Sequence, residues 1–503
     1  MIFIETGFDK NTNDIYALTK AFYPGEEVRI TGGQNTDPDM YHTVIKAENC
    51  GKVGKLVYKY GEGDIFEVDV PTDDRDELKR IIYRVLSKRT GVELPWGSLT
   101  GIRPTKMVRD RLEAGMSDDI INNDMKQCYY ISQEKMRLAL EIAKREIDLV
   151  RPLSPSNHYS LYVNIPFCPT RCLYCSFTSN AVGTNRTKVC EYLETLFREI
   201  RETSGILKGR VLDTVYIGGG TPTALLPEEM DNLLSVLEDS FDMGSIHELT
   251  VEAGRPDSFS VGKLRVLKRH NVTRISVNPQ SMNQKTLNII GRKHTVEQTK
   301  DAFHMARDEG FENINMDMII GLPGERSEDV RNTVDTLCQL NPDSLTVHSL
   351  ALKRASVMNV MLNSPYSIDN KTKETLQENI RRESNNKELN DIAAVSPKEA
   401  ELMMKIASDG AKSLGMHPYY LYRQKNMAGN LENTGYAKEG KYGLYNILIN
   451  EEIQDILALG AGAISKCIDE KGNTKRSANY KAVHDYISGI DEMIDRKRRL
   501  FNK

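Results

Sequence analysis

The amino-acid sequence predicts an α/β fold built around a parallel β-sheet. Between Ser160 and Ala351, short apolar segments of strand character alternate with longer amphipathic stretches of helical character. Each intervening stretch is long enough to hold a helix, which is the crossover that neighbouring parallel strands require. The predicted strands are SLYVNI, DTVYI, ELTVE, RISV, NINMDMII and SLTVHS.

The regions around this central part differ from it in pattern. Residues 1–155 begin with short alternating runs such as EVRIT and KLVYKY and continue with helical periodicity, which predicts an N-terminal α+β accessory domain. The proline- and serine-rich stretch RPLSPS marks its end, and residues 156–352 then hold the predicted sheet. Residues 353–395 are polar and charged and are predicted to form a connection. Residues 396–503 are predicted to form a mainly helical C-terminal accessory domain.

Composition excludes several classes of protein. The 503 residues suit about three domains, and 39% hydrophobic residues allow a sizeable core. With 71 acidic and 67 basic residues the chain has no excess of positive charge that would hold nucleic acid. Its longest nearly apolar run, from Ile456 to Ser465, is far shorter than the ~18 residues of a membrane span. The N-terminal sequence lacks the features of a secretory signal, so we expect a soluble cytoplasmic protein.

Three of the eight cysteines form a compact motif. Cys168, Cys172 and Cys175 stand at the spacing C-x3-C-x2-C directly after the first predicted strand. Thiolates at these separations can hold one 4Fe-4S cluster and leave one iron without a protein ligand. A zinc site would need a fourth ligand, and His158 is ten residues upstream across the strand; zinc and unligated thiols remain the alternatives. The isolated cysteines are expected to be inert thiols: Cys50, Cys128, Cys190, Cys338 and Cys467.

The cysteine motif in this setting resembles the radical S-adenosylmethionine (radical SAM) superfamily. There the free iron binds the amino and carboxylate groups of S-adenosylmethionine, and one-electron reduction yields a 5′-deoxyadenosyl radical. The segments GGGTPT and IGLPG resemble that superfamily's glycine motif and adenine motif. Together with IPFCxxxCxYC, RISVNPQS and IGRKH they occur in the order typical of oxygen-independent coproporphyrinogen III dehydrogenases. The flanking segments WGSLTGIRPTK and YYLYRQKNMAGNLENTGYA resemble HemZ-type members of that group.

This resemblance implies a partial (β/α)6 barrel with a 4Fe-4S cluster and S-adenosylmethionine at the C-terminal ends of its strands. Two of the implied contacts, Glu252 and Asp317, lie in predicted strands, where a carboxylate without a partner is costly. Arg292 could face the methionine carboxylate of the cofactor as a fork. The implied cofactor contacts are Tyr162, Tyr174, Gly219, Gly220, Thr221, Glu252, Gln280, Arg292, Asp317, Ala351 and Ile464.

The resemblance also implies a reaction, the oxidative decarboxylation of two propionates of coproporphyrinogen III to vinyl groups, which gives protoporphyrinogen IX. Such a reaction draws on an electron donor such as flavodoxin or ferredoxin. The four carboxylates of the substrate call for cationic partners. The candidate cations are Arg423, Lys425 and Arg103.

Two positions depart from the pattern of the dehydrogenases. The chain has Asn164 where they usually carry histidine and Phe177 where they carry a fourth cysteine. The related haem chaperones share the phenylalanine, but their HNxxYW motif is absent from this sequence. Two alternatives therefore stand beside the dehydrogenase: a haem-binding chaperone or carrier, and a radical enzyme acting on another tetrapyrrole.

Overall fold

The computed structural model divides into two compact units. Unit 1 comprises Met1–Glu141, Ala394–Glu401 and Tyr422–Glu432, and unit 2 comprises Ile142–Ala393, Leu402–Leu421 and Asn433–Lys503. The described residues are 2–6, 12–23, 26, 28–31, 43–50, 53–60, 64–71, 74–101, 103–153, 157–177, 180–182, 186–351, 356–363, 370–385, 387, 389–392, 395–424, 427 and 430–502. In none of these stretches is a helix both long and apolar enough to cross a membrane.

Unit 1 has an α+β architecture, as predicted for the N-terminal region. Its sheet has the order β2-β1-β3-β4-β5, with β1 parallel to both neighbours and the remaining pairs antiparallel. Helices α1 and α2 bury Ile15, Leu18, Leu78 and Ile82 in one hydrophobic core. The elements are β1 Ile2–Thr6, α1 Thr12–Phe22, β2 Val28–Thr31, β3 Thr43–Cys50, β4 Val53–Tyr60, β5 Asp64–Pro71, α2 Arg75–Thr90, α3 Pro104–Glu113, α4 Asp118–Tyr129 and α5 Gln133–Val150, which continues into unit 2.

Unit 2 contains the predicted parallel sheet. The strands β6, β9, β10, β11, β12 and β13 lie side by side in chain order and are all parallel. The whole sheet has eleven strands, in the order β14-β15-β13-β12-β11-β10-β9-β6-β16-β17-β18. Its edge strands β14 and β18 do not pair with each other, so the barrel is partial, as predicted. The strands are β6 His158–Ile165, β9 Val211–Gly219, β10 Glu248–Glu252, β11 Arg274–Gln280, β12 Ile314–Ile320, β13 Ser344–Ser349, β14 His417–Tyr422, β15 Asn433–Ala437, β16 Asp455–Leu459, β17 Ile464–Ile468 and β18 Thr474–Ala478.

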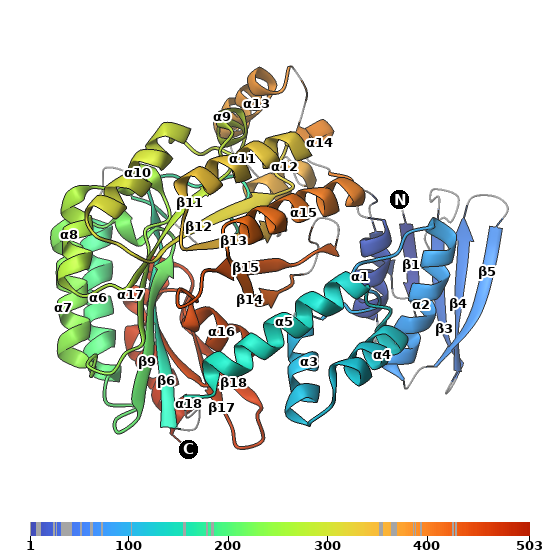
Figure 1. The fold of residues 1–503 in the computed structure, drawn as a ribbon, viewed down its shortest axis with the longest axis horizontal. Coiled ribbons are helices and arrows are strands. Elements are labelled where there is room, and N and C mark those ends of the chain that lie inside the picture. The colour runs from blue at the N-terminus through green and yellow to red at the C-terminus, as the bar shows by residue number, and fades with distance from the viewer. Residues whose placement is uncertain are drawn as a thin grey trace. The chain divides into compact units, whose positions relative to one another are not determined.

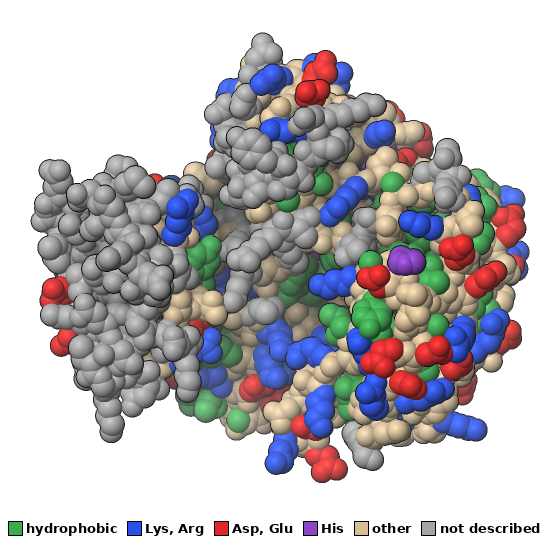
Figure 2. Space-filling view, turned by 180° about the vertical axis from the view of Figure 1, so that it is seen from behind, with side chains coloured by type: hydrophobic (Ala, Val, Ile, Leu, Met, Phe, Trp, Pro, Cys, Tyr) green, Lys and Arg blue, Asp and Glu red, His purple; other side chains and the backbone are tan. Residues whose placement is uncertain are grey.

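Helices cover the outer face of this sheet. Figure 1 shows α6, α7, α8, α10 and α11 on one side of the strands, with α16 on the other. On the outside, acidic and basic side chains are interspersed over the face that Figure 2 presents. The helices of unit 2 are α6 Thr187–Thr203, α7 Pro227–Ser240, α8 Val261–Arg269, α9 Gln284–Ile289, α10 Val296–Asp308, α11 Ser327–Leu340, α12 Val357–Asn363, α13 Asn370–Glu383, α14 Leu389–Ile392, α15 Pro397–Ser413 (shared with unit 1), α16 Leu444–Glu451, α17 Val483–Ser488 and α18 Ile490–Phe501.

The two faces of the parallel strands have opposite chemistry because side chains alternate along a strand. Residues such as Leu161, Val215 and Val251 are buried toward the helices. The alternate positions are polar and form what we call the lumen face, on the concave side. Glu252 and Asp317 therefore lie on the polar face of strands whose other face is apolar. The lumen face is formed by Ser160, Tyr162, Asn164, Thr214, Tyr216, Glu248, Thr250, Glu252, Ser276, Asn278, Asn315, Asp317, Ser344, Thr346 and His348.

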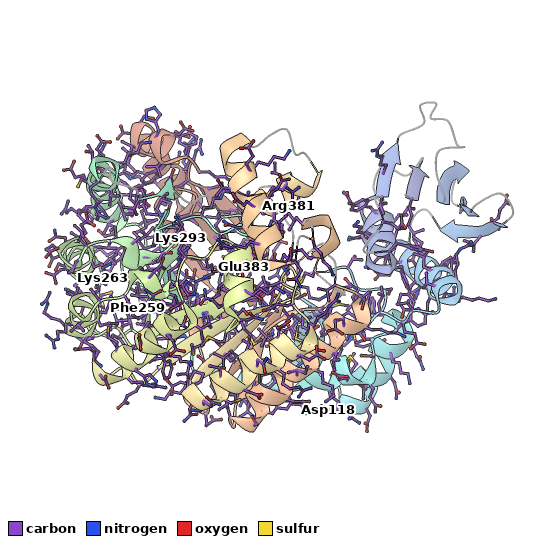
Figure 3. All side chains as sticks on the ribbon, turned by 90° about the horizontal axis from the view of Figure 1, so that it is seen from above. Asp118, Phe259, Lys263, Lys293, Arg381 and Glu383 are labelled. Atoms are coloured by element: carbon purple, nitrogen blue, oxygen red, sulfur yellow. The ribbon has the colours of Figure 1, made fainter. Side chains whose placement is uncertain are left out.

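The segment predicted as a polar connection contributes buried side chains to unit 2. Met358, Ile380, Leu389 and Ile392 belong to one hydrophobic cluster with Leu173, which lies between the second and third cysteines of the motif. The amide of Met358 also donates to the carbonyl of Leu173 at 2.9 Å. Charged side chains occupy other positions of α13, where Figure 3 labels Arg381 and Glu383. Sparse apolar positions thus fasten this charged segment to the cysteine loop.

The C-terminal region adds strands as well as helices. Strand β16 pairs in parallel with β6, and β15 pairs antiparallel with β13. These additions extend both sides of the six-stranded core. The C-terminal region is thereby part of the same sheet as the strands that carry the predicted site.

Candidate functional site

The cysteine loop, residues 166–177, follows β6 and is tied to the glycine run that follows β9. The amide of Gly220 donates to the carbonyl of Ile165 at 2.9 Å, and the amide of Thr221 donates to Phe167 at 2.7 Å. The Thr221 hydroxyl donates to the sulfur of Cys168 at 3.5 Å. The two motifs that were singled out in sequence therefore form one structure at the C-terminal ends of neighbouring strands.

Gly219 and Gly220 are required because the cysteine loop and the end of β6 approach their backbone closely. Gly219 has a φ of +112°, and a Cβ there would lie 2.1 Å from Oδ1 of Asn164. A Cβ on Gly220 would lie 2.6 Å from the Phe167 carbonyl oxygen and 2.9 Å from the Cys168 sulfur. Glycine alone fits such a contact, since any side chain would push the loop away.

The three thiols suit an iron–sulfur cluster. Burial raises the pKa of Cys175 to about 11; a hydrogen bond from the backbone of Phe177 opposes this shift, and the charges of Cys172 and Cys168 add to it. Buried sulfur ligands that repel one another as thiolates need cationic iron to hold them ionised. No three His, Cys, Asp or Glu side chains in the described ranges are placed to share one metal ion. A 4Fe-4S cluster needs no such convergence, because each thiolate binds its own iron atom.

Arg292 fastens the cysteine loop to the ends of β10 and β11. Its Nη1 donates to the Tyr174 hydroxyl at 3.0 Å, and its Nη2 donates to the carbonyls of Asn278 at 2.7 Å and Gly254 at 3.3 Å. The side chain is buried, and its Nε has no partner. Burial raises the pKa of Tyr174, so this hydroxyl stays protonated. Arg292 thus orients the loop tyrosine, and Nε remains available to a ligand.

Two lumen-face carboxyl groups have pKa values shifted in opposite directions. Burial raises the pKa of Glu252 to about 7, against the hydrogen bond that Tyr216 donates to it at 2.6 Å. Burial also acts on Asp317, but His348 (Nε2 to Oδ2, 3.7 Å) and the Asn315 amide (2.6 Å) lower its pKa below the usual value. At neutral pH Asp317 is ionised, while Glu252 lies close to its midpoint. Such divergent pairs are typical of functional sites.

The C-terminal half of β11 contains buried polar atoms for which the structure shows no hydrogen-bond partner. Oγ of Ser276, Oδ1 of Asn278 and Oε1 of Gln280 are all buried and accept no hydrogen bond. Gln280 also has a φ of +67°, next to a register shift between β11 and β12. Buried polar atoms are normally satisfied, so three in succession indicate a place for a polar ligand. A nucleoside with an amino-acid moiety, such as S-adenosylmethionine, has the donors that these acceptors need.

A stack of three tyrosines lies beside these groups. The Tyr216 and Tyr445 ring centroids are 4.6 Å apart, and Tyr162 lies 6.2 Å from Tyr216 and 6.3 Å from Tyr445. Tyr445 comes from α16, on the concave side of the sheet (Figure 1). Sequence reasoning found Tyr162 but missed Tyr216, His348 and Tyr445. The polar alternation along each strand could have revealed Tyr216 and His348, whereas nothing local marks Tyr445.

The remaining predicted cofactor residues are placed at the edges of this region. Ala351 is half-buried, two residues after the end of β13. Ile464 begins β17 and is 45% exposed. It follows a turn held against β6, because the Asn164 amide donates to the Ala461 carbonyl at 2.6 Å. These positions lie near the strand ends of unit 2 without a contact that assigns them a ligand.

The predicted substrate cations belong to unit 1 or lie outside the described residues. Arg423 is 3% exposed and is bound to the carbonyl of Leu99 at 2.8 Å and to Oδ1 of Asn430 at 2.6 Å. Burial lowers its pKa to about 10. The structure therefore gives Arg423 a structural role, because its donors are used within the protein. Arg103 is half-buried directly before α3, and Lys425 lies outside the described residues.

Comparisons with known proteins identify the family of this chain. A sequence profile described as the Radical SAM superfamily matches residues 162–337. The chain is 39% identical, over 91% of its length and 87% of the other protein, to the oxygen-independent coproporphyrinogen-III oxidase-like protein HemZ of Bacillus subtilis. It is 36% identical to the heme chaperone HemW of Bacillus subtilis, over 39% of this chain and 52% of that protein.

The solved structure of a coproporphyrinogen III oxidase from Escherichia coli, titled a radical SAM enzyme, shares the fold. It matches with a TM-score of 0.50 and 21% identity, over 67% of this chain and 70% of that one. The superfamily implies a 4Fe-4S cluster and S-adenosylmethionine, and the clustered thiols and the unsatisfied atoms of β11 fit both. On the identity and extent of the HemZ alignment, this chain belongs to the radical SAM superfamily as a HemZ-type member.

Proposed function

We propose that this protein oxidatively decarboxylates propionate side chains of coproporphyrinogen III to vinyl groups, giving protoporphyrinogen IX. The observation that carries the proposal is the 39% identity to the coproporphyrinogen-III oxidase-like protein HemZ across nearly the whole chain. The polar lumen face beside the cysteine loop supports it, because a tetrapyrrole with several carboxylates and pyrrole N–H groups needs polar partners.

The bound cluster and S-adenosylmethionine would supply a 5′-deoxyadenosyl radical through one-electron reduction by a donor such as flavodoxin or ferredoxin. At each propionate this radical would take one hydrogen atom from the β-carbon and become 5′-deoxyadenosine. The substrate would then lose carbon dioxide and pass one electron to an external one-electron acceptor, which leaves the vinyl group. In this proposal Cys168, Cys172 and Cys175 hold the cluster. Asp317 and Glu252 bind the polar and cationic groups of S-adenosylmethionine, while Arg292 keeps Tyr174 in place.

The two carboxylates are expected to give different pH dependences of S-adenosylmethionine affinity. Glu252, with a pKa raised to about 7, must lose its proton before it pairs with a cation, so wild-type affinity should rise with pH up to about 7 and then level off. Glu252→Gln should bind roughly 10- to 100-fold more weakly at pH 8 and show no such rise. Asp317→Asn should bind more weakly at every pH above 6 and keep the rise, because the pKa of Asp317 is lowered.

Equilibrium titration of the reconstituted protein with S-adenosylmethionine across this pH range measures both effects. Glu297→Gln is the matched control, since Glu297 lies exposed at the start of α10 on the outside of the sheet and forms a surface ion pair with Lys300 at 2.8 Å. Unchanged affinity in both lumen variants, with the cluster intact, would show that the two carboxylates serve the fold alone.

Product analysis tests the substrate. Coproporphyrinogen III, S-adenosylmethionine and a strong reductant, incubated anaerobically with the reconstituted protein, should give 5′-deoxyadenosine and a mono- or divinyl product. Cleavage of S-adenosylmethionine without any vinyl product would refute the substrate and favour another tetrapyrrole.

A haem chaperone is the second candidate, because the chain is also 36% identical to HemW over 39% of its length and carries Phe177. Phe177 is 64% exposed at the end of the cysteine loop. Stoichiometric haem binding without cleavage of S-adenosylmethionine would favour this candidate over the decarboxylase.

A further inference from the structure

A buried arginine lies against one cysteine of the loop. Arg255 follows β10 and is only 4% exposed. Its Nη1 donates to the Cys172 sulfur at 3.6 Å and to the Thr170 carbonyl at 3.1 Å. We infer that Arg255 tunes the iron–sulfur cluster, raising its reduction potential through the hydrogen bond to Cys172 and its positive charge. This inference rests on the three-cysteine cluster of the proposed function and not on the substrate.

The guanidinium of Arg255 is held in place by Asp257 as well as by its contacts with the cysteine loop. Asp257 binds the guanidinium in a bidentate manner, with Nε to Oδ1 at 2.9 Å and Nη2 to Oδ2 at 2.6 Å. Planar fork-to-carboxylate pairs of this kind fix both distance and orientation. The Asp257 pair uses Nε and Nη2, so Nη1 is left to point at the cysteine loop.

The short segment that carries this pair is itself fastened from two sides. The Ser258 hydroxyl donates to the Arg255 carbonyl at 2.6 Å. Lys263 Nζ donates to the Ser258 carbonyl at 2.9 Å and to the Thr223 carbonyl at 2.5 Å. Figure 3 labels Lys263 and the adjoining Phe259 in this part of unit 2. A cation on such a support keeps its distance from Cys172 when the charge of a bound cluster changes.

The sign of the effect follows from electrostatics. Reduction adds one negative charge to a cluster that three thiolates already make anionic. A hydrogen bond to a ligand sulfur and a fixed cation both stabilise the more negative state, which raises the potential. Arg255 and Cys172 are both buried, so solvent screens this interaction less than it would at the surface. The Asp257 carboxylate opposes Arg255, because its negative charge is held against the same guanidinium and offsets part of the positive field that reaches Cys172.

This opposition separates tuning from simple support of the loop. If Arg255 only supports the loop, removing it or removing its anchor Asp257 should disturb the cluster in the same way. If Arg255 tunes the cluster, Arg255→Gln should lower the reduction potential and Asp257→Asn should raise it. Arg255→Lys keeps the positive charge but loses the bidentate pairing with Asp257, so its reduction potential should lie between those of the wild type and Arg255→Gln.

The test is a redox titration of anaerobically reconstituted protein, followed by electron paramagnetic resonance, with iron and sulfide content determined in each sample. In Arg255→Gln we expect the reduction equilibrium to shift about tenfold toward the oxidised cluster, which corresponds to 59 mV for a one-electron couple. Asp257→Asn should shift it in the opposite direction. Arg265→Gln, which removes an exposed arginine paired with Glu309 at 3.1 Å on the outer face of α8, should leave the potential unchanged.

Equal potentials at equal cluster content, or shifts of the same sign in the Arg255 and Asp257 variants, would overturn the inference. Loss of the cluster in all three variants would also overturn it, since Arg255 would then act only on the loop. A wild-type protein that binds no cluster would instead contradict the three-cysteine ligand set and remove the basis for tuning. If the reduction potentials shift as expected but the wild-type protein forms no vinyl product, the inference stands and only the proposed substrate is contradicted.

Discussion

Replacing Cys168, Cys172 or Cys175 by alanine is expected to abolish the cluster and, with it, cleavage of S-adenosylmethionine. Wild-type protein should take up about one 4Fe-4S cluster per chain on anaerobic reconstitution. Each variant removes one of the sulfur ligands on a single loop, and two thiolates cannot hold the cube with one iron open for the cofactor. Iron and sulfide content, visible absorbance and 5′-deoxyadenosine formation measure the loss.

Cysteines outside the loop provide the control for this experiment. Cys190 is exposed on α6, and Cys467 is buried in β17. Cys338 is half-buried, and its thiol donates to the carbonyl of Gly410 in α15 at 3.8 Å. Alanine at any of these positions should leave cluster content unchanged. A Cys172→Ala variant with full cluster content, or wild-type protein that binds tetrahedral zinc instead, would contradict the assignment.

Replacing Lys497 by methionine is expected to lower the free energy of unfolding by about 3–5 kcal/mol, because it leaves a buried carboxylate without its cation. Lys497 in α18 is 1% exposed, and its Nζ lies 2.6 Å from Oε1 of Glu199, which is fully buried in α6. The other oxygen of Glu199 accepts hydrogen bonds from the Gly460 amide and the Tyr486 hydroxyl, both at 2.7 Å. The network therefore joins the last helix to the turn that precedes Ile464.

Urea denaturation followed by circular dichroism measures this effect. Arg499→Met, which removes an exposed cation of the same helix, should change stability by less than about 0.5 kcal/mol. In the double variant Glu199→Gln/Lys497→Met no charge is left buried, so it should be more stable than Lys497→Met alone. A Lys497→Met protein as stable as the Arg499→Met protein would show that the buried pair contributes little.

Several features of the site could be predicted from sequence because short segments encode them. The cysteines are within one loop, the glycine run directly follows a strand, and alternation of strands and helices identifies the parallel sheet. The alternation of polar and apolar residues along each strand also indicates the polar lumen face. It explains why Glu252 and Asp317 occur in strands whose alternate residues are apolar. That signal is present in each strand, and its meaning depends only on the rule that successive side chains point to opposite faces.

Other features depended on residues that are distant in sequence. Arg423 was predicted to bind substrate, but Leu99 and Asn430 surround it and use its donors. Likewise, Ile380 of the charged helix α13 belongs to the same hydrophobic cluster as Leu173 of the cysteine loop.

The sequence by itself determined the alternation of strands and helices, the cysteine loop and the glycine turn, since each follows from local periodicity or from spacing within a few residues. Only the tertiary structure decided the partners of the buried charged groups. The burial of Arg255 beside Cys172 depends on how β10 and the cysteine loop meet in space. The buried Glu199–Lys497 pair likewise joins residues almost 300 positions apart in the chain. A charge is stable in the interior only with a partner, and chain packing, not local spacing, brings that partner to it.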